Sequence, residues 1–225
     1  MLRNLGLDKN IRENIDGKYL TIYADDFLEG IEFARQIKIS QIQFVNMSND
    51  ILIDFINIEK LSEYLQVISF VGIWENISNL NSIYSLKNIK KIYIQQKQKF
   101  TIDISKFPNI IHLGCEYWRG ILFENALSLT SLVLVKFANN NLQQLKKLKK
   151  LNALHIYCSK IKELKGIEYL PIEILYLARN KYLEDILTIE QLPQLIKLTI
   201  EKCSNASIDA IHSNILNRID IQIIK

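Results

Sequence analysis

Aliphatic residues recur along this chain every twenty-odd residues, and this recurrence constrains the fold more than any other feature. In each unit an apolar residue is followed two positions later by another and preceded three positions earlier by a third, as Leu175 is by Leu177 and Ile172. The pattern occurs ten times at steps of 19 to 26 residues, anchored on Ile22, Ile42, Ile68, Ile92, Leu113, Leu132, Leu154, Leu175, Leu198 and Ile219. So many similar units predict a repeat architecture rather than an ordinary globular domain.

Each unit predicts one short strand, because apolar residues two apart lie on the same face of a strand. The return between units is short, and the 225 residues include only 7 Gly and 3 Pro. This scarcity of turn residues favours parallel strands stacked coil upon coil over antiparallel hairpins. The chain is therefore expected to form one superhelix with its strands side by side.

The units resemble the leucine-rich-repeat family, whose repeat reads L-x-x-L-x-L-x-x-N/C-x-L. The resemblance runs from about Tyr19 to the carboxyl terminus and is clearest over residues 89–203. It implies an α/β solenoid, a horseshoe with a parallel sheet of about ten short strands on the concave face and helices, 3₁₀ segments or turns on the convex face. Only Asn180 and Cys203 match the family's asparagine position, so packing between coils is expected to rely more on apolar side chains.

We expect a single domain over residues 1–225, with an amino-terminal cap at 1–18, repeats at 19–203, and a carboxyl-terminal cap with the last strand at 204–225. Both caps have a polar, partly helical sequence. Helices are predicted on the convex side at 25–37 and at 49–65, the second capped by Asp50 or Asn49. Later, shorter units should return through turns or 3₁₀ segments.

Composition bounds the class of protein. No run of about 18 apolar residues is present and the first twenty residues carry regular charges, so a cytoplasmic protein is expected. Cys115, Cys158 and Cys203 form no CxxC pair, which argues against disulfides and zinc; we expect Cys115 and Cys203 to be core thiols and Cys158 to be exposed. The heavy use of Ile, Lys and Asn suggests a bacterial source.

No catalytic constellation is recognisable. The sequence has no Walker loop, no G-x-S-x-G, no H-E-x-x-H and no G-x-G-x-x-G. The three histidines do not have the spacing of metal ligands. Asp25 and Asp26 do not have the spacing of an acid–base pair, and Asp at the start of a helix is the commoner explanation for them. We expect a protein that is not an enzyme and has no metal or cofactor.

The residues between the paired apolar positions should face outward on the concave side. In the first such slot of each strand the alignment places Tyr23, Gln43, Ser69, Tyr93, Gly114, Val133, His155, Tyr176, Thr199 and Asp220, and two positions further Asp25, Val45, Val71, Gln95, Glu116, Val135, Tyr157, Ala178, Glu201 and Gln222. An apolar and aromatic centre with a polar rim is the typical arrangement of a protein–protein interface. The candidate partner-binding residues are Tyr93, Glu116, Trp118, Val133, Val135, His155, Tyr157, Tyr176, Arg179, Lys197 and Glu201.

Two alternatives stay open for these residues. Concave side chains of a narrow horseshoe can simply pack on one another, and Trp118 either belongs to the interface or fills the core in place of the ladder asparagine. The run at 145–150, LKKLKK, is interpreted as a solvated turn rather than a site for a polyanion.

The leading functional hypothesis is a non-enzymatic scaffold that binds another protein on the concave face, such as a bacterial immunity protein that blocks a toxin, or a regulatory adaptor. The alternative is RNA or polyanion binding through the carboxyl-terminal half, which has 15 basic and 11 acidic residues after His112. The concave positions are mixed in sign, which favours the protein partner over nucleic acid. Neither a membrane nor a small-molecule substrate is expected.

Overall fold

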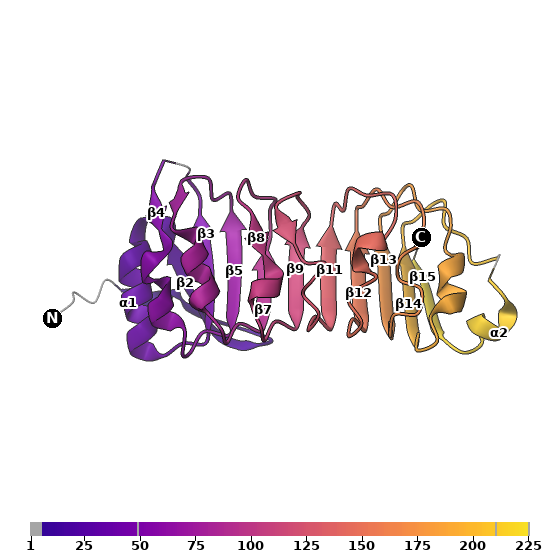
Figure 1. Cartoon of the computed structure of the whole chain (residues 1–225), viewed down its shortest axis with the longest axis horizontal. Coiled ribbons are helices and arrows are strands. Elements are labelled where there is room, and N and C mark those ends of the chain that lie inside the picture. The colour runs from indigo at the N-terminus through magenta and orange to yellow at the C-terminus, as the bar shows by residue number, and fades with distance from the viewer. Residues whose placement is uncertain (1–5, 49, 210, 225) are drawn as a thin grey trace.

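The computed structural model describes residues 6–48, 50–209 and 211–224. Within them the main sheet has eleven strands, ten of which run parallel in chain order along the molecule (Figure 1). The parallel strands are β2 (Gly17–Tyr23), β3 (Gln41–Asn46), β5 (Val67–Gly72), β7 (Lys91–Ile94), β9 (His112–Glu116), β11 (Ser131–Val135), β12 (Ala153–Tyr157), β13 (Ile174–Ala178), β14 (Lys197–Glu201) and β15 (Asp220–Ile224). The predicted solenoid of about ten parallel strands is confirmed.

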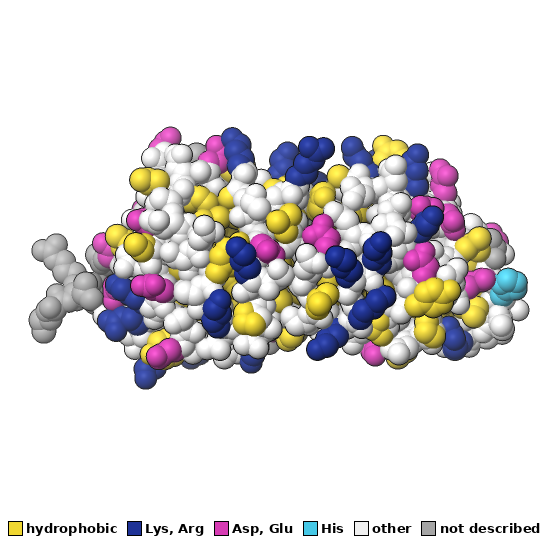
Figure 2. Space-filling model, in the orientation of Figure 1, with side chains coloured by type: hydrophobic (Ala, Val, Ile, Leu, Met, Phe, Trp, Pro, Cys, Tyr) yellow, Lys and Arg dark blue, Asp and Glu magenta, His cyan; other side chains and the backbone are white. Residues whose placement is uncertain are grey.

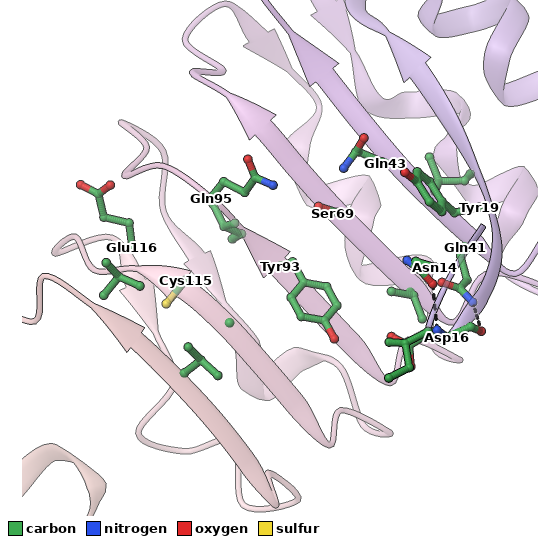
Figure 3. A pocket seen from close by; sticks show the side chains of 17 residues that line it. Asn14, Asp16, Tyr19, Gln41, Gln43, Ser69, Tyr93, Gln95, Cys115 and Glu116 are labelled. Carbon is green, nitrogen blue, oxygen red and sulfur yellow. Dashed lines mark hydrogen bonds between the residues drawn. The ribbon is translucent and has the colours of Figure 1, made fainter. Parts of the chain in front are cut away.

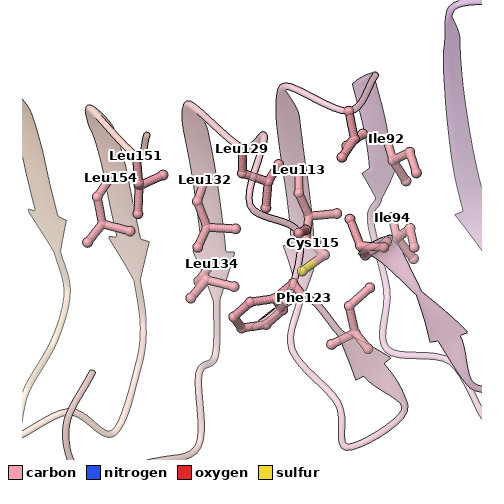
Figure 4. Close-up of a cluster of buried hydrophobic side chains, with 14 of the residues drawn as sticks. Ile92, Ile94, Leu113, Cys115, Phe123, Leu129, Leu132, Leu134, Leu151 and Leu154 are labelled. Atoms are coloured by element: carbon pink, nitrogen blue, oxygen red, sulfur yellow. The ribbon is translucent and has the colours of Figure 1, made fainter. Parts of the chain in front are cut away.

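Equivalent residues of successive coils stack directly on one another. Ile92 pairs with Leu113, Leu113 with Leu132 and Leu132 with Leu154, and all four side chains are fully buried (Figure 4). The residues two positions further along each of these strands, Cys115 among them, form a second buried row. Because neighbouring strands of a sheet lie only about 4.8 Å apart, each aliphatic side chain packs against the same position in the coils above and below it.

The anchors of the first and last strands are corrected by two residues. Leu20, not Ile22, pairs with Ile42, and Ile221, not Ile219, pairs with Leu198. Thr21 and Gln222 therefore occupy the outward positions that the sequence alignment gave to Tyr23 and Asp220. Both strands carry apolar residues at every second position, and such a pattern fits two registers that differ by two residues.

The amino-terminal cap is a β-hairpin rather than the partly helical segment expected. A 3₁₀ turn, η1 (Leu7–Asn10), leads into β1 (Ile11–Asn14), which pairs antiparallel with β2. The turn contains Asp16–Gly17, a dipeptide typical of tight hairpins, with Gly17 at φ 107°. The expectation of parallel pairing throughout overlooked this signal.

One of the two predicted convex helices is confirmed. A short turn, η2 (Ala24–Asp26), precedes α1 (Phe27–Ile37), which buries Phe27, Ile31 and Ala34 against the sheet. The second, predicted over 49–65, is wrong: a two-residue strand, β4 (Ile53–Asp54), is followed by a 3₁₀ helix, η3 (Phe55–Leu61).

The cap of η3 explains that difference. Asp54 Oδ1 accepts the N–H of Ile56 at 2.9 Å, so Asp54 and not Asp50 is the capping residue, and Asn49 lies outside the described residues. Pairing of β4 with β6 (Ile77–Ser78) in the next coil keeps the preceding residues extended. The pairing between coils thus overrides the helical periodicity of the segment.

Later coils return through short segments, as expected. The 3₁₀ turns are η4 (Leu80–Ser85), η5 (Ile104–Lys106), η6 (Gln143–Leu145) and η7 (Leu187–Gln191), with the strand pair β8 (Ile102–Asp103) and β10 (Ile121–Leu122) between them. A single turn of helix, α2 (Ser213–Leu216), lies in the last coil. Leu145, Leu148 and Leu151 are buried while the intervening lysines are exposed, so the LKKLKK segment is a solvated turn.

Polar side chains link consecutive coils more extensively than expected. Asn180 Oδ1 accepts the N–H of Ser159 at 2.9 Å, and Ser159 Oγ accepts the N–H of Phe137 at 3.0 Å. Nearer the amino terminus, buried Gln98 accepts the N–H of Trp74 at 2.9 Å and donates to Gly72. Ser159 and Gln98 therefore take over part of the hydrogen bonding that asparagine supplies in the repeat consensus, which includes neither Ser nor Gln.

Candidate functional site

An aromatic cluster lies on the concave face at β12 and β13. His155 pairs with Tyr176 on the next strand, their rings stack at 5.5 Å between centroids with a 20° interplanar angle, and Tyr157 lies 5.4 Å from Tyr176. On the other side, Val133 and Val135 of β11 pair with His155 and Tyr157. The structure thus brings together five of the predicted binding residues, here called the aromatic cluster, and all five are partly exposed: Val133, Val135, His155, Tyr157 and Tyr176.

Polar groups within the cluster satisfy one another. The Tyr176 hydroxyl donates to Glu201 Oε2, and His155 Nδ1 lies 3.3 Å from the Tyr157 hydroxyl. Arg179 Nη2 lies 3.9 Å from Glu201 Oε1. These internal contacts hold the rings in one arrangement.

A rim of charged residues flanks the cluster on both sides. Lys136 Nζ lies 3.3 Å from Glu116 Oε1 on the side of β9, and Lys197 begins β14 on the other side. Arg179 and Lys136 each follow a strand in the left-handed region, with φ near 55°. The N–H of Arg179 donates to the carbonyl of Glu201, and the N–H of Lys136 donates to the carbonyl of Tyr157, each in the next coil. This conformation lets the chain turn away from the sheet while the backbone hydrogen bonds between coils continue.

Trp118 is a core residue. Its side chain is 9% exposed, and its Nε1 donates to the Phe100 carbonyl at 2.8 Å. The indole packs edge-on against Phe100 at 5.9 Å. Of the two alternatives drawn from the sequence, the structure supports the one in which Trp118 replaces the ladder asparagine.

The amino-terminal half of the concave face has a hollow of about 690 Å³ that the sequence did not predict. Its floor is formed by outward residues of β3 to β11, including Gln43, Ser69, Tyr93, Gln95 and Glu116 (Figure 3). Val133 and Val135 belong to both the hollow and the aromatic cluster, so the two are continuous. The hollow is within the size range of ligand-binding clefts.

The tip of the β1–β2 hairpin forms one wall of the hollow. Asp16 accepts a hydrogen bond from Lys91 Nζ at 2.6 Å, and its carbonyl accepts one from Gln41 Nε2. Lys91 is on β7, so the hairpin reaches past β3 and β5 to this contact. The Asp16–Gly17 turn was the only sequence signal for this wall, and its direction depends on tertiary contacts.

Burial changes the pKa values of two histidines on the concave face. Burial lowers the pKa of His112 to about 4, and it also lowers the pKa of His155. The ring of His112 lies between Tyr93, 4.9 Å away, and Ser131 Oγ, 2.8 Å from its Nδ1. Both histidines are therefore neutral at pH 7 and add no charge to this face.

The cysteines fit the structural roles expected of them. Cys115 and Cys203 are buried and Cys158 is exposed, and burial raises the pKa of Cys115 to about 12. Among the described residues, no group of three or more His, Cys, Asp or Glu could hold a metal ion, and no helix is long and apolar enough to span a membrane.

The stacked parallel strands and the exposed concave sheet define a leucine-rich-repeat fold. Internalin C2 of Listeria monocytogenes is similar to this chain in structure, with a TM-score of 0.59 and 17% identity over 94% of this chain and 87% of internalin C2. The internalin InlF of the same organism matches with a TM-score of 0.56 and 14% identity, over 87% of this chain. The chain spans only 59% of the length of InlF.

A further solved structure with this fold is a TLR13 complex with a single-stranded RNA, with a TM-score of 0.52, 15% identity, and coverage of 81% of this chain and 31% of TLR13. At these identities the likeness concerns the fold. No protein-family model matches the chain, and no curated protein matches it.

Proposed function

We propose that this chain is a non-enzymatic scaffold that binds a protein partner on its concave face, with the aromatic cluster at the centre of the contact. The observation that supports this most is the preorganisation of His155, Tyr157 and Tyr176 by stacking and by the Tyr176–Glu201 hydrogen bond. Rigid aromatic side chains bind with little loss of conformational entropy, which is why they concentrate binding energy.

The charges around the cluster favour a partner with mixed polar groups. The rim carries both signs within two ion pairs, Lys136–Glu116 and Arg179–Glu201. Each cation is well exposed, at 63% for Lys136 and 60% for Arg179, so either can exchange its intramolecular carboxylate for one on the partner. Rim charges of this kind steer association more than they add affinity.

Within this function, we propose the role of a bacterial cytoplasmic immunity protein or a regulatory adaptor. An elongated concave sheet suits the occlusion of a folded protein surface. The three free thiols fit a reducing compartment. Finding a toxin that the chain binds and inactivates would support immunity, whereas a bound regulator that keeps its activity would support an adaptor.

Photo-crosslinking tests the location of the contact. A photoreactive amino acid at position 157 or 176 should capture the partner from cells that produce the chain, and the same residue at 169 or 182 should not. Tyr169 and Tyr182 are matched controls, because they are also tyrosines, are 76% and 55% exposed, and lie in the return segments. Capture only from positions 169 and 182 would place the interface elsewhere.

Recognition of single-stranded RNA is the second candidate, supported by the RNA in the TLR13 complex. Figure 2 shows Lys and Arg side chains gathered over the middle of the face drawn, with acidic side chains more frequent toward both ends. Phosphate contacts would make affinity fall steeply with salt. Binding of a labelled RNA that is lost between 50 and 200 mM salt, roughly, would support this candidate.

A further inference from the structure

Positive charge gathers at the edge of the sheet where strands β9 to β14 end. The first residue after each strand donates its N–H to the last residue of the next strand, as Lys136 does to Tyr157 and Arg179 to Glu201, so these residues form a row. This row is Tyr117, Lys136, Cys158, Arg179 and Lys202, and the row two residues further on is Arg119, Ala138, Lys160, Lys181 and Ser204. None of them is Asp or Glu. Their cations, here called the basic edge, are Arg119, Lys136, Lys160, Arg179, Lys181 and Lys202.

The same two rows contain no cation in the coils of β2, β3, β5 and β7. The equivalent positions there are Ala24, Asn46, Gly72 and Gln96 in the first row, and Asp26, Ser48, Trp74 and Gln98 in the second. The whole chain has 28 Lys and Arg against 24 Asp and Glu, so composition by itself would place both signs in these rows in nearly equal numbers. The basic edge is therefore a local concentration of charge and not a reflection of the net charge of the chain.

Most of these cations have no carboxylate of their own. Lys136 lies 3.3 Å from Glu116, and Arg179 lies 3.9 Å from Glu201. Within the described part of the chain, no ion pair forms at the other four cations, all of them exposed: Arg119, Lys160, Lys181 and Lys202. Neighbouring strands lie about 4.8 Å apart, which is less than the Debye length of about 8 Å at physiological ionic strength. The fields of neighbouring cations therefore add, and the edge attracts a ligand with several negative groups.

The basic edge borders the aromatic cluster on the concave face. Val135 of the cluster immediately precedes Lys136 in the chain, so a partner centred on the cluster reaches the edge. The sheet row of Val135 also includes Glu116 and Glu201, one on each side of the cluster. These carboxylates oppose a nucleic-acid strand, whose backbone has a negative charge at every nucleotide. A protein surface can place acidic residues at the edge and neutral or basic residues over the two glutamates.

We propose that the protein partner contributes an acidic segment, rich in Asp and Glu, which lies along the basic edge while the rest of the partner contacts the aromatic cluster. This inference rests on the proposed function, because it concerns the chemistry of the protein that occupies the concave face. The contacts of Lys136 and Arg179 with glutamates of this chain show that carboxylates reach these cations. Complementary charge at the border of an interface speeds association and excludes partners of the wrong sign.

Fluorescence anisotropy of a labelled oligoglutamate peptide, measured with the full chain at physiological salt, tests the edge alone. The wild type should bind the peptide. Combining Lys160→Glu, Lys181→Glu and Lys202→Glu should weaken binding at least about tenfold, because three attractive charges become repulsive. The matched control combines Lys146→Glu, Lys149→Glu and Lys150→Glu, which change the net charge equally at exposed lysines of a return segment. The control should weaken binding less than about threefold, since salt screens charges away from the edge.

Three results would overturn the proposal. The first is a wild-type chain that does not bind the peptide. The second is an equal loss of binding in the edge variant and the control variant, because net charge alone would then explain the affinity. The third is a labelled oligouridine that binds more tightly than the peptide through the same three lysines, since the edge would then be a nucleic-acid site. Circular dichroism of both variants should match the wild type, because all six substituted lysines are exposed.

Failure of this proposal can be told apart from failure of the proposed function. Photo-crosslinking at positions 157 and 176 reports the contact on the concave face, and neither residue belongs to the basic edge. If the partner is captured there, the edge variant should reduce its capture and the control variant should not. Capture that is unchanged in the edge variant would leave the scaffold function intact and overturn the acidic segment alone.

Discussion

The side-chain amide of Asn180 accepts the backbone N–H of Ser159 in the preceding coil at 2.9 Å. The same side chain donates to the carbonyl of Ile156 at 3.0 Å and is fully buried. One residue thus satisfies two backbone groups that water cannot reach. In a solenoid such links are needed where the chain leaves the sheet and the ladder of backbone hydrogen bonds ends.

Replacing Asn180 by Ala should lower the free energy of unfolding by roughly 2–4 kcal/mol, because two buried backbone groups lose their partners. Urea denaturation followed by circular dichroism measures this change. Asn140→Ala, at an exposed asparagine of the same half, is the control and should change stability by less than about 0.5 kcal/mol. Equal stability of the two variants would contradict the role given to Asn180.

Leu154 lies in the middle of the stacked aliphatic row and is fully buried. Leu154→Asp should destabilise the protein by about 4 kcal/mol or more, since a carboxylate there has no partner within the core. Leu127→Asp is the control, because Leu127 is 56% exposed in a return segment. The far-ultraviolet circular dichroism spectrum should collapse only for the core variant, and a normally folded Leu154→Asp protein would refute the repeat register.

The Lys91–Asp16 contact anchors the hairpin that walls the concave hollow, and the hydrogen bond to Asp16 raises the pKa of Lys91. Lys91→Met should increase hydrogen exchange of the amides in β1 and the hairpin turn, while global stability falls by less than about 1 kcal/mol because the pair is partly exposed. Lys99→Met, which breaks the more exposed pair with Glu75, should leave hairpin exchange unchanged. Unaltered exchange in both variants would show that the hairpin does not depend on Lys91.

Stability should depend on pH through His112. Burial lowers the pKa of His112 from 6.5 to about 4, so below pH 6.5 the unfolded chain binds a proton that the folded chain does not. The melting temperature should therefore fall as the pH is lowered from 6.5 toward 4, and this contribution should become flat below pH 4. His112→Gln should reduce that dependence, whereas His212→Gln, at an exposed ring, should not. Identical pH profiles for wild type and His112→Gln would exclude the effect.

Much of the concave face could be predicted from the sequence, because the period of two within a strand and the interval between strands together give each side chain its face and its neighbours. Val133, His155 and Tyr176 were placed side by side by this reasoning, and the strand pairing agrees. Trp118 could not be placed, since an indole after a strand fits either a core slot or a surface. Its hydrogen bond to Phe100 in the preceding coil decides the matter.

The sequence by itself determined the solenoid, its direction of stacking and the inward rows, because these depend on a regular pattern of aliphatic residues that has one way to be buried. Tertiary structure alone decided the register of the end strands and the path of the amino-terminal hairpin over the sheet. Each of these depends on which neighbour a segment finds in space, and local periodicity does not specify that neighbour.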